Sequence, residues 1–192
     1  PLLNYHLGYA VLLGMKRNGA LANIIDGTDG SETPYDHILA AALPLSKVVK
    51  ARTEKQRVAI ILPPGRAGLV ANIAVVLANK VPVNLNFTAS KDAVESAIQQ
   101  GDLDFFITAN ALRQKMSRFA WPADEQTLLI EKALPKVKWR IAIWLLLTRF
   151  LSAAKIASMI GLPKEGGDKE AVLLFTSGSS GEPKGVALTH TN

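Results

Sequence analysis

The 192-residue sequence contains no cysteine, which excludes a disulfide framework, a thiolate metal site and a cysteine nucleophile. Histidine is scarce, and His6, His37 and His190 lie too far apart in the sequence to show the spacing of metal ligands. No run of about 18 uncharged apolar residues is present, so the sequence predicts no membrane-spanning helix. Hydrophobic residues make up 48% and charged residues 20%, a composition that indicates a globular chain rather than a disordered one.

Acidic residues are outnumbered in only one part of the sequence. Residues 111–155 contain nine basic and three acidic residues, whereas the rest of the chain has 13 of each, so the net charge of +6 is local. All three tryptophans lie in the same segment. Such a segment can bind nucleic acid, anionic lipid or an acidic protein, and it can equally be a solvated face beside a buried helix.

Strands and helices are expected to alternate along most of the chain. The expected strands are residues 21–26, 57–62, 81–85, 103–108, 127–130 and 171–175, and the expected helices are residues 34–49, 68–80, 91–100, 110–119 and 139–160. This order predicts an α/β fold in which a parallel sheet carries helices on both faces. Thr33 is expected to cap the first of these helices and Ser90 the third, and residues 161–169 are expected to form a surface linker.

The helix expected over residues 139–160 allows three interpretations. Its sequence is strongly apolar, with Arg149, Ser152 and Lys155 recurring on about one face. It could pack on the sheet, it could lie in a membrane interface where the protein collects acyl chains, or it could dock an acidic carrier protein.

The segment with the most chemical information is Phe175 to Val186, which reads Phe-Thr-Ser-Gly-Ser-Ser-Gly-Glu-Pro-Lys-Gly-Val. It follows an expected buried strand. Glycines allow a close approach of the backbone, consecutive N–H groups can surround an anion, hydroxyls donate hydrogen bonds and lysine adds a positive charge. This combination predicts a site for a polyphosphate.

Spacing excludes the other common loops of this kind. A Walker A loop needs glycine five residues after its first glycine, but Pro183 and Val186 stand at the two positions concerned. The dinucleotide pattern G-x-G-x-x-G is absent, and Glu182 replaces the last glycine of a lipase elbow. A flexible serine- and glycine-rich linker is the remaining alternative, which the lysine, the proline and the strands on both sides disfavour.

The run from Thr176 to Val186, followed by Thr189 and His190, resembles the signature loop of the AMP-forming adenylating enzymes. This superfamily includes acyl-CoA synthetases, peptide-synthetase adenylation domains and firefly luciferase. Ser180 stands where the family usually has threonine, which keeps the hydroxyl. Residues 80–90 look most similar to the acyl-acyl-carrier-protein synthetase half of bacterial bifunctional 2-acylglycerophosphoethanolamine acyltransferases, with long-chain fatty acyl-CoA ligases as near neighbours.

The resemblance implies an ATP-dependent ligase of two half-reactions, which uses Mg²⁺. A fatty acid carboxylate attacks the α-phosphorus of ATP to give acyl-AMP and pyrophosphate, and a thiol of CoA or acyl carrier protein then takes the acyl group and releases AMP. By resemblance, the β- and γ-phosphates are held by Thr176, Ser177, Gly178, Ser179, Ser180, Gly181 and Lys184. No nucleic-acid partner and no metal ligand is expected, and His190 is given no catalytic role.

The resemblance also implies a division of the chain. Residues 1–20 would form an N-terminal extension, and residues 21–192 the N-terminal part of the AMP-binding domain, ending just after the loop at 175–186. The adenine-binding residues, the Mg²⁺-binding glutamate and the catalytic lysine of the family lie further downstream. We therefore expect this polypeptide alone to be inactive, and the full-length protein to be cytoplasmic, with membrane contact through residues 111–160 as a further hypothesis. The alternative is a non-catalytic module that binds phosphate or docks on a membrane or a carrier protein.

Overall fold

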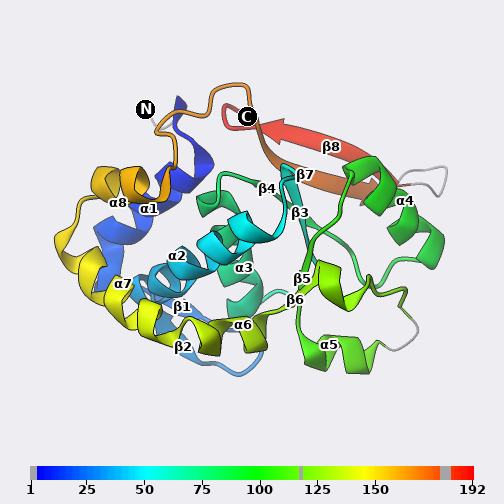
Figure 1. Cartoon of the computed structure of the whole chain (residues 1–192), viewed down its shortest axis with the longest axis horizontal. Helices are drawn as coiled ribbons and strands as arrows, with labels where there is room; N and C mark the ends of the chain where they lie inside the picture. Colours follow the sequence, from blue (N-terminus) through cyan, green and yellow to red (C-terminus); the bar gives the residue numbers. More distant parts are fainter. Residues whose placement is uncertain (1–3, 117–118, 178–182) are drawn as a thin grey trace.

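The core of the protein is a six-stranded sheet, seen in the computed structural model, which describes residues 4–116, 119–177 and 183–192. The strands lie in the order β6-β5-β3-β4-β7-β8, and every neighbouring pair is parallel except β7 and β8 (Figure 1). Their bounds are Arg57–Ile60 for β3, Val81–Asn84 for β4, Phe106–Thr108 for β5, Thr127–Leu129 for β6, Glu170–Ser177 for β7 and Pro183–Thr189 for β8. The predicted α/β class with a mostly parallel sheet is confirmed.

Helices cover both faces of this sheet. Their bounds are Leu7–Asn18 for α1, Tyr35–Arg52 for α2, Arg66–Leu77 for α3, Lys91–Gly101 for α4, Asn110–Lys115 for α5, Ile130–Lys136 for α6, Lys138–Phe150 for α7 and Ala153–Ile160 for α8, with short 3₁₀ helices at Gly19–Leu21 and Asp124–Gln126. In Figure 1, α2, α7 and α8 lie to the left of the strands and α4 and α5 to the right.

Alternation along β3 explains why two cores form. Val58 and Ile60 are buried with α1, α2 and α3 on one face, whereas Ala59 and Ile61 are buried with residues of α4 and α5 on the other. Successive side chains of a strand point to opposite faces, so an unbroken apolar strand is buried on both sides. Ser90 caps α4 as predicted, because its side chain accepts a hydrogen bond from the backbone N–H of Ala93.

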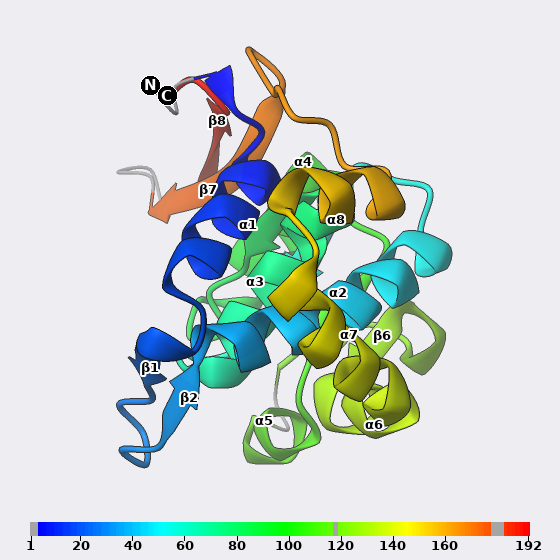
Figure 2. The ribbon, with the colours of Figure 1, turned by 90° about the vertical axis from the view of Figure 1, so that its left-hand side faces the viewer.

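The first predicted strand is present, but it does not join the main sheet. β1 (Asn23–Ile25) pairs antiparallel with β2 (Glu32–Pro34) in a separate two-stranded sheet, seen at the lower left of Figure 2. The prediction that Thr33 caps α2 is therefore wrong. Thr33 pairs with Ile24 in this sheet and its hydroxyl accepts a hydrogen bond from Arg66, so α2 begins at Tyr35 with Pro34 as its N-cap.

The expected helix over residues 139–160 is two helices. α7 ends at Phe150, and Ser152 caps α8 by accepting a hydrogen bond from the backbone N–H of Lys155. A serine in the middle of an apolar segment therefore acts here as a start signal. The helix α6, which precedes α7, was not predicted from the sequence, and its interior Pro135 obscures the pattern.

The N-terminal helix belongs to the packed body of the protein. Tyr9, Leu12 and Met15 of α1 are buried in the same core as α2, α3 and α8. Within the part of the chain that the structure describes, no helix is long and apolar enough to cross a membrane.

Candidate functional site

The predicted phosphate loop connects β7 to β8, the antiparallel pair at one edge of the sheet. β7 enters the sheet beside β4, where Val83 pairs with Leu173, and its apolar residues Ala171 and Leu173 are buried. Thr176 then pairs with Lys184, and Ser177 pairs with Pro183. The two strands therefore hold both ends of the loop in a fixed register.

Three of the seven predicted site residues lie in these strand ends. The Thr176 hydroxyl donates a hydrogen bond to the Lys184 carbonyl at 3.4 Å, and the Lys184 side chain is exposed. Ser177 is the last residue of β7. Gly178, Ser179, Ser180 and Gly181 lie outside the described residues. Thr176 and Lys184 therefore lie directly across from each other on the two strands of the hairpin.

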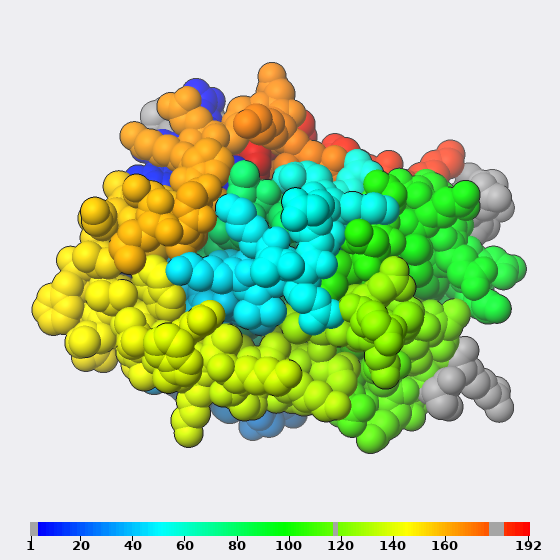
Figure 3. Space-filling model, in the orientation of Figure 1, coloured from blue at the N-terminus to red at the C-terminus, as the bar shows by residue number. Residues whose placement is uncertain are grey.

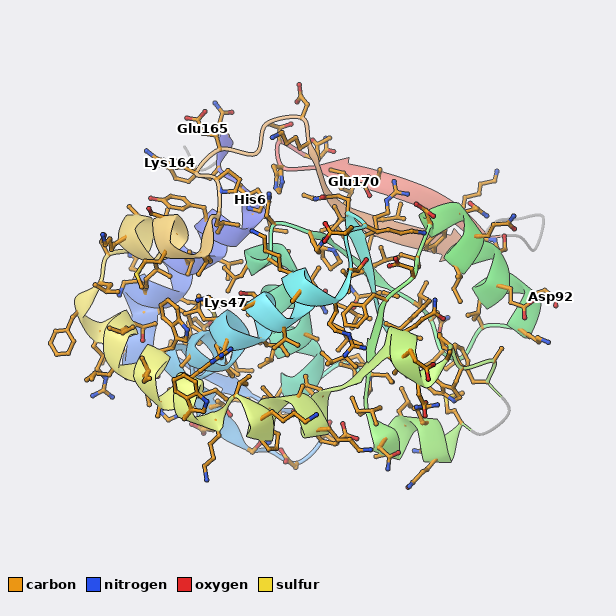
Figure 4. The ribbon with its side chains drawn as sticks, viewed as in Figure 1. His6, Lys47, Asp92, Lys164, Glu165 and Glu170 are labelled. Atoms are coloured by element: carbon orange, nitrogen blue, oxygen red, sulfur yellow. The ribbon has the colours of Figure 1, made fainter. Side chains whose placement is uncertain are left out.

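Two polar contacts attach the hairpin to the rest of the protein. The Gln100 side chain in α4 donates to the Pro183 carbonyl at 3.0 Å, directly beside the loop. At the other end of β7, Arg57 and Glu170 form a two-pronged ion pair with distances of 2.9 and 2.8 Å, which raises the pKa of the Arg57 guanidinium. Because β4 lies between β3 and β7, this pair spans a strand and fixes the start of β7, where Figure 4 shows Glu170.

A cavity of about 320 Å³ opens beside the hairpin. That volume is near the lower limit for small-molecule sites. Most of its wall is apolar, and its lining comes from the end of β4, the start of α4 and the two strands: Leu85, Asn86, Ala89, Ser90, Ala93, Val94, Ala97, Phe175, Thr176 and Pro183. Sequence reasoning missed this cavity. The one available signal was the four-residue spacing of the small residues Ala93 and Ala97, which places them on one face of α4.

His190 connects the end of β8 to the N-terminal helix. Its Nδ1 accepts a hydrogen bond from the backbone N–H of Leu7 at 2.9 Å, and its ring lies 4.1 Å from that of His6. His6, labelled in Figure 4, caps α1. Burial lowers the pKa of His6 to about 4, with the neighbouring His190 adding to the effect. Burial also lowers the pKa of His190, followed by the charge of Lys169. His190 therefore has a structural contact 183 residues away in the chain.

The donor set at the hairpin fits a polyphosphate. The exposed Lys184 ammonium and the Thr176 hydroxyl flank the loop, and both groups bind phosphate oxygens elsewhere in proteins. The hydroxyl would exchange its 3.4 Å hydrogen bond to the Lys184 carbonyl for one to phosphate. The described residues offer no comparable site for Mg²⁺. Residues 4–116, 119–177 and 183–192 bring together no group of three or more His, Cys, Asp or Glu side chains that could hold a metal ion.

Comparisons with known proteins concern the chain as a whole. The family model described as AMP-binding enzyme matches residues 18–192. Among solved structures, VinN in complex with 3-methylaspartate is 19% identical, with a TM-score of 0.70 over 98% of this chain and 49% of its own. The inhibitor-bound N-terminal domain of FACL13 from Mycobacterium tuberculosis is 17% identical, with a TM-score of 0.67 over 97% of this chain and 44% of its own.

A third structure carries an adenylate. The nonribosomal peptide synthetase FmoA3, bound to alpha-methyl-L-serine-AMP, is 17% identical, with a TM-score of 0.70 over 98% of this chain and 19% of its own. At these identities the likeness shows a shared fold. The chain spans about half, or less, of the length of these solved structures.

Proposed function

Because the chain belongs to the AMP-binding enzyme family, we propose that it is the N-terminal part of an ATP-dependent, AMP-forming ligase that activates a fatty acid. Enzymes of this family use ATP, usually with Mg²⁺, and act on an acid and a thiol carrier. In this proposal residues 21–192 are the N-terminal part of the AMP-binding domain. Residues 1–20 precede it as an extension, whose helix α1 packs on the domain's core.

The single observation that carries the proposal is the position of Thr176 and Lys184. They lie at the two ends of a glycine- and serine-rich loop, opposite each other in a hairpin whose base is fixed by the Arg57–Glu170 pair. We assign β- and γ-phosphate binding to Thr176, Ser177 and Lys184, together with Gly178, Ser179, Ser180 and Gly181 of the loop. Charge neutralisation and positioning are most of what such a site contributes, because phosphoryl oxygens carry the developing charge.

The proposed chemistry needs no covalent bond to the protein. A carboxylate oxygen of the acid forms a bond to the α-phosphorus of ATP, and the bond from that phosphorus to the bridging oxygen breaks, so pyrophosphate leaves. A thiolate then attacks the acyl carbon, and AMP leaves with the electron pair of the broken bond. The residues of this chain hold the pyrophosphate part of ATP in place during the first step.

The choice of a fatty acid rests on the cavity beside the hairpin. Seven of its lining residues are leucine, alanine, valine, phenylalanine or proline, which suits an alkyl chain better than a polar side chain. The resemblance of residues 80–90 supports the same class and suggests acyl carrier protein or CoA as the acceptor. The two amino-acid ligands in the matched structures make an amino acid the alternative substrate class.

Acid-dependent exchange between ATP and labelled pyrophosphate tests the substrate class. We expect the natural protein that contains this chain to exchange label with medium- or long-chain fatty acids, and the 192-residue chain alone to show none. Exchange with amino acids but not with fatty acids would show that the substrate is an amino acid, and it would still support an AMP-forming ligase. Exchange with none of these acids would overturn the ligase itself, and turnover by the 192-residue chain would refute the expectation that it is inactive alone.

A second candidate function is a docking module that does not catalyse, and the basic segment 111–155 favours it. Its nine basic residues stand against three acidic ones, and two of those three are already engaged, because Asp124 pairs with Arg113 and Glu131 accepts from the backbone N–H of Asn110. A protein that binds vesicles or carrier protein, yet shows no exchange with any acid, would be a module of this kind.

A further inference from the structure

α7 presents a row of large apolar side chains to solvent. Trp139, Ile143, Leu146 and Phe150 are 60%, 45%, 58% and 79% exposed. Their spacing of four, three and four residues places them on one stripe of the helix. The opposite side of α7, with Trp144 and Thr148, is buried against the body of the protein. The helix is therefore apolar on both its buried side and its outer side.

This outer stripe differs from the scattered apolar residues of ordinary surfaces. A single exposed leucine needs no explanation, but a contiguous apolar patch marks an interaction site. Figure 3 shows the yellow segment that contains α7 at the left-hand edge of the molecule, where it forms an outer ridge. Side chains that project separately from a ridge are suited to insertion into lipid, because the lipid chains can pack around each of them.

Positive charges border the stripe on both sides. At 100° per residue, Arg140 lies about 100° from Trp139 on one side, and Lys138 and Arg149 lie about 80° to 100° away on the other. All three side chains are exposed, and α7 contains no acidic residue. The Arg140 guanidinium lies 5.0 Å from the centre of the Trp139 ring. Arg149 is 4.0 Å from Asp36 but keeps 61% of its side chain exposed.

We propose that α7 is an interfacial helix that seats the protein on an anionic membrane surface. The four apolar side chains would enter the boundary between headgroups and acyl chains, and Lys138, Arg140 and Arg149 would meet the lipid phosphates. Thirteen residues make a helix of about 20 Å, too short to cross a bilayer but suited to lying in its plane. An acidic carrier protein is the alternative occupant, but its negative charge would match only the cations, whereas a lipid surface matches both the cations and the apolar stripe.

This proposal goes beyond the proposed ligase activity, since membrane contact requires no turnover. It also corrects the hypothesis drawn from the sequence, which placed Arg149, Ser152 and Lys155 on the face of a single helix. In the structure Ser152 and Lys155 belong to the start of α8, and the stripe is confined to α7.

Vesicle co-sedimentation tests the proposal. We expect the protein to bind phosphatidylcholine vesicles that contain about 30% phosphatidylglycerol, and to bind pure phosphatidylcholine at least tenfold more weakly. Raising the salt from 0.05 to 0.5 M should weaken the binding without abolishing it, because the apolar contribution is not screened. The double variant Trp139→Glu/Phe150→Glu should lose binding at least tenfold.

The matched control is the double variant Leu174→Glu/Val186→Glu, which adds the same two charges at exposed apolar residues of β7 and β8, away from α7 (Figure 1). It should bind like the wild type, and circular dichroism should show all variants folded. Four results would overturn the proposal: no binding of the wild type to anionic vesicles, unchanged binding of the double variant, equal loss in the control, or binding by the 192-residue chain but not by the longer natural protein. A stripe that joins two copies would appear as a dimer that the double variant dissociates, without vesicle binding.

Discussion

Lys184 is the described residue whose side chain the proposed function uses most directly. Its ammonium is exposed at the end of the loop, opposite Thr176, where the strands fix its backbone. In the proposed function this lysine would stabilise a bound polyphosphate without any change in the fold. Its removal should therefore affect catalysis and leave stability untouched.

We predict that Lys184→Ala in the active natural protein lowers kcat/KM for ATP by about 10- to 100-fold, the size expected for one charge-assisted contact. The control is Lys47→Ala, which removes an exposed lysine of α2 on another part of the surface (Figure 4). Steady-state kinetics at varied ATP would measure both variants. Equal kinetics for Lys184→Ala and wild type would show that this lysine does not hold phosphate.

His6 makes stability depend on pH. Burial lowers its pKa from 6.5 to about 4, so the folded protein keeps the ring neutral where the unfolded chain would protonate it. Its contribution is complete above pH 6.5 and is lost as pH falls toward 4. Across that window the free energy of unfolding should fall by up to about 1.4 kcal/mol per pH unit from this group alone.

Urea unfolding at pH 7, 6 and 5 measures this slope. His6→Asn is the informative variant, because asparagine also accepts a hydrogen bond at a helix N-cap but does not titrate. The variant should lose part of the decline between pH 7 and pH 5. A variant with the same slope as wild type would mean that other groups cause it.

At the scale of elements, His190 at the end of β8 packs closely against the segment that precedes β7. Gly166 lies under His190, and a Cβ atom added there would come within 2.2 Å of the His190 ring. Gly14 in α1 is the opposite case, since nothing lies within 4 Å of an added Cβ atom. Substitution of Gly166 therefore tests packing, whereas substitution of Gly14 tests helix propensity.

We predict that Gly166→Ala lowers the free energy of unfolding by about 1–3 kcal/mol, because either His190 or the backbone must move. Gly14→Ala should raise it by up to about 1 kcal/mol, since alanine is favoured over glycine inside a helix. Denaturant titration measures both. If Gly166→Ala were as stable as the wild type, the contact with His190 would not restrict the side chain at residue 166.

The elements of the main sheet were predictable because their signals are local. The apolar run at Val58–Ile61 and the capping serine at Ser90 define β3 and α4 without knowledge of the fold. The incorrect predictions concern residues whose structural partners are distant in the sequence. Thr33 carries a capping signal, but its pairing with Ile24 and its hydrogen bond from Arg66 place it in a strand instead.

The candidate site shows the same division. The motif identified Thr176 and Lys184, since their spacing is a property of the sequence. The cavity beside them could not be predicted, because its wall joins β4, α4 and the hairpin, which lie up to about 100 residues apart. The exposed stripe of α7 was hidden for a related reason: apolar spacing alone does not reveal which side of a helix faces the core.

At the scale of the whole molecule, the β7–β8 hairpin and α7 lie on opposite sides. Strands β7 and β8 lie at the upper right of Figure 1, and α7 lies at the lower left, so membrane contact through α7 would leave these two strands uncovered. One arrangement would therefore serve both proposals. A ligase that takes an apolar acid could rest on the lipid through α7 while Thr176 and Lys184, on the other side, bind ATP.

The most direct test of the account is the identity of the nucleotide product. The natural protein that contains this chain should convert ATP to AMP and pyrophosphate, in equal amounts and only with a fatty acid and a thiol acceptor present, as chromatography of the quenched reaction would show. Formation of ADP and phosphate, or of AMP at a rate independent of the acid, would contradict the assignment of this loop to an AMP-forming ligase.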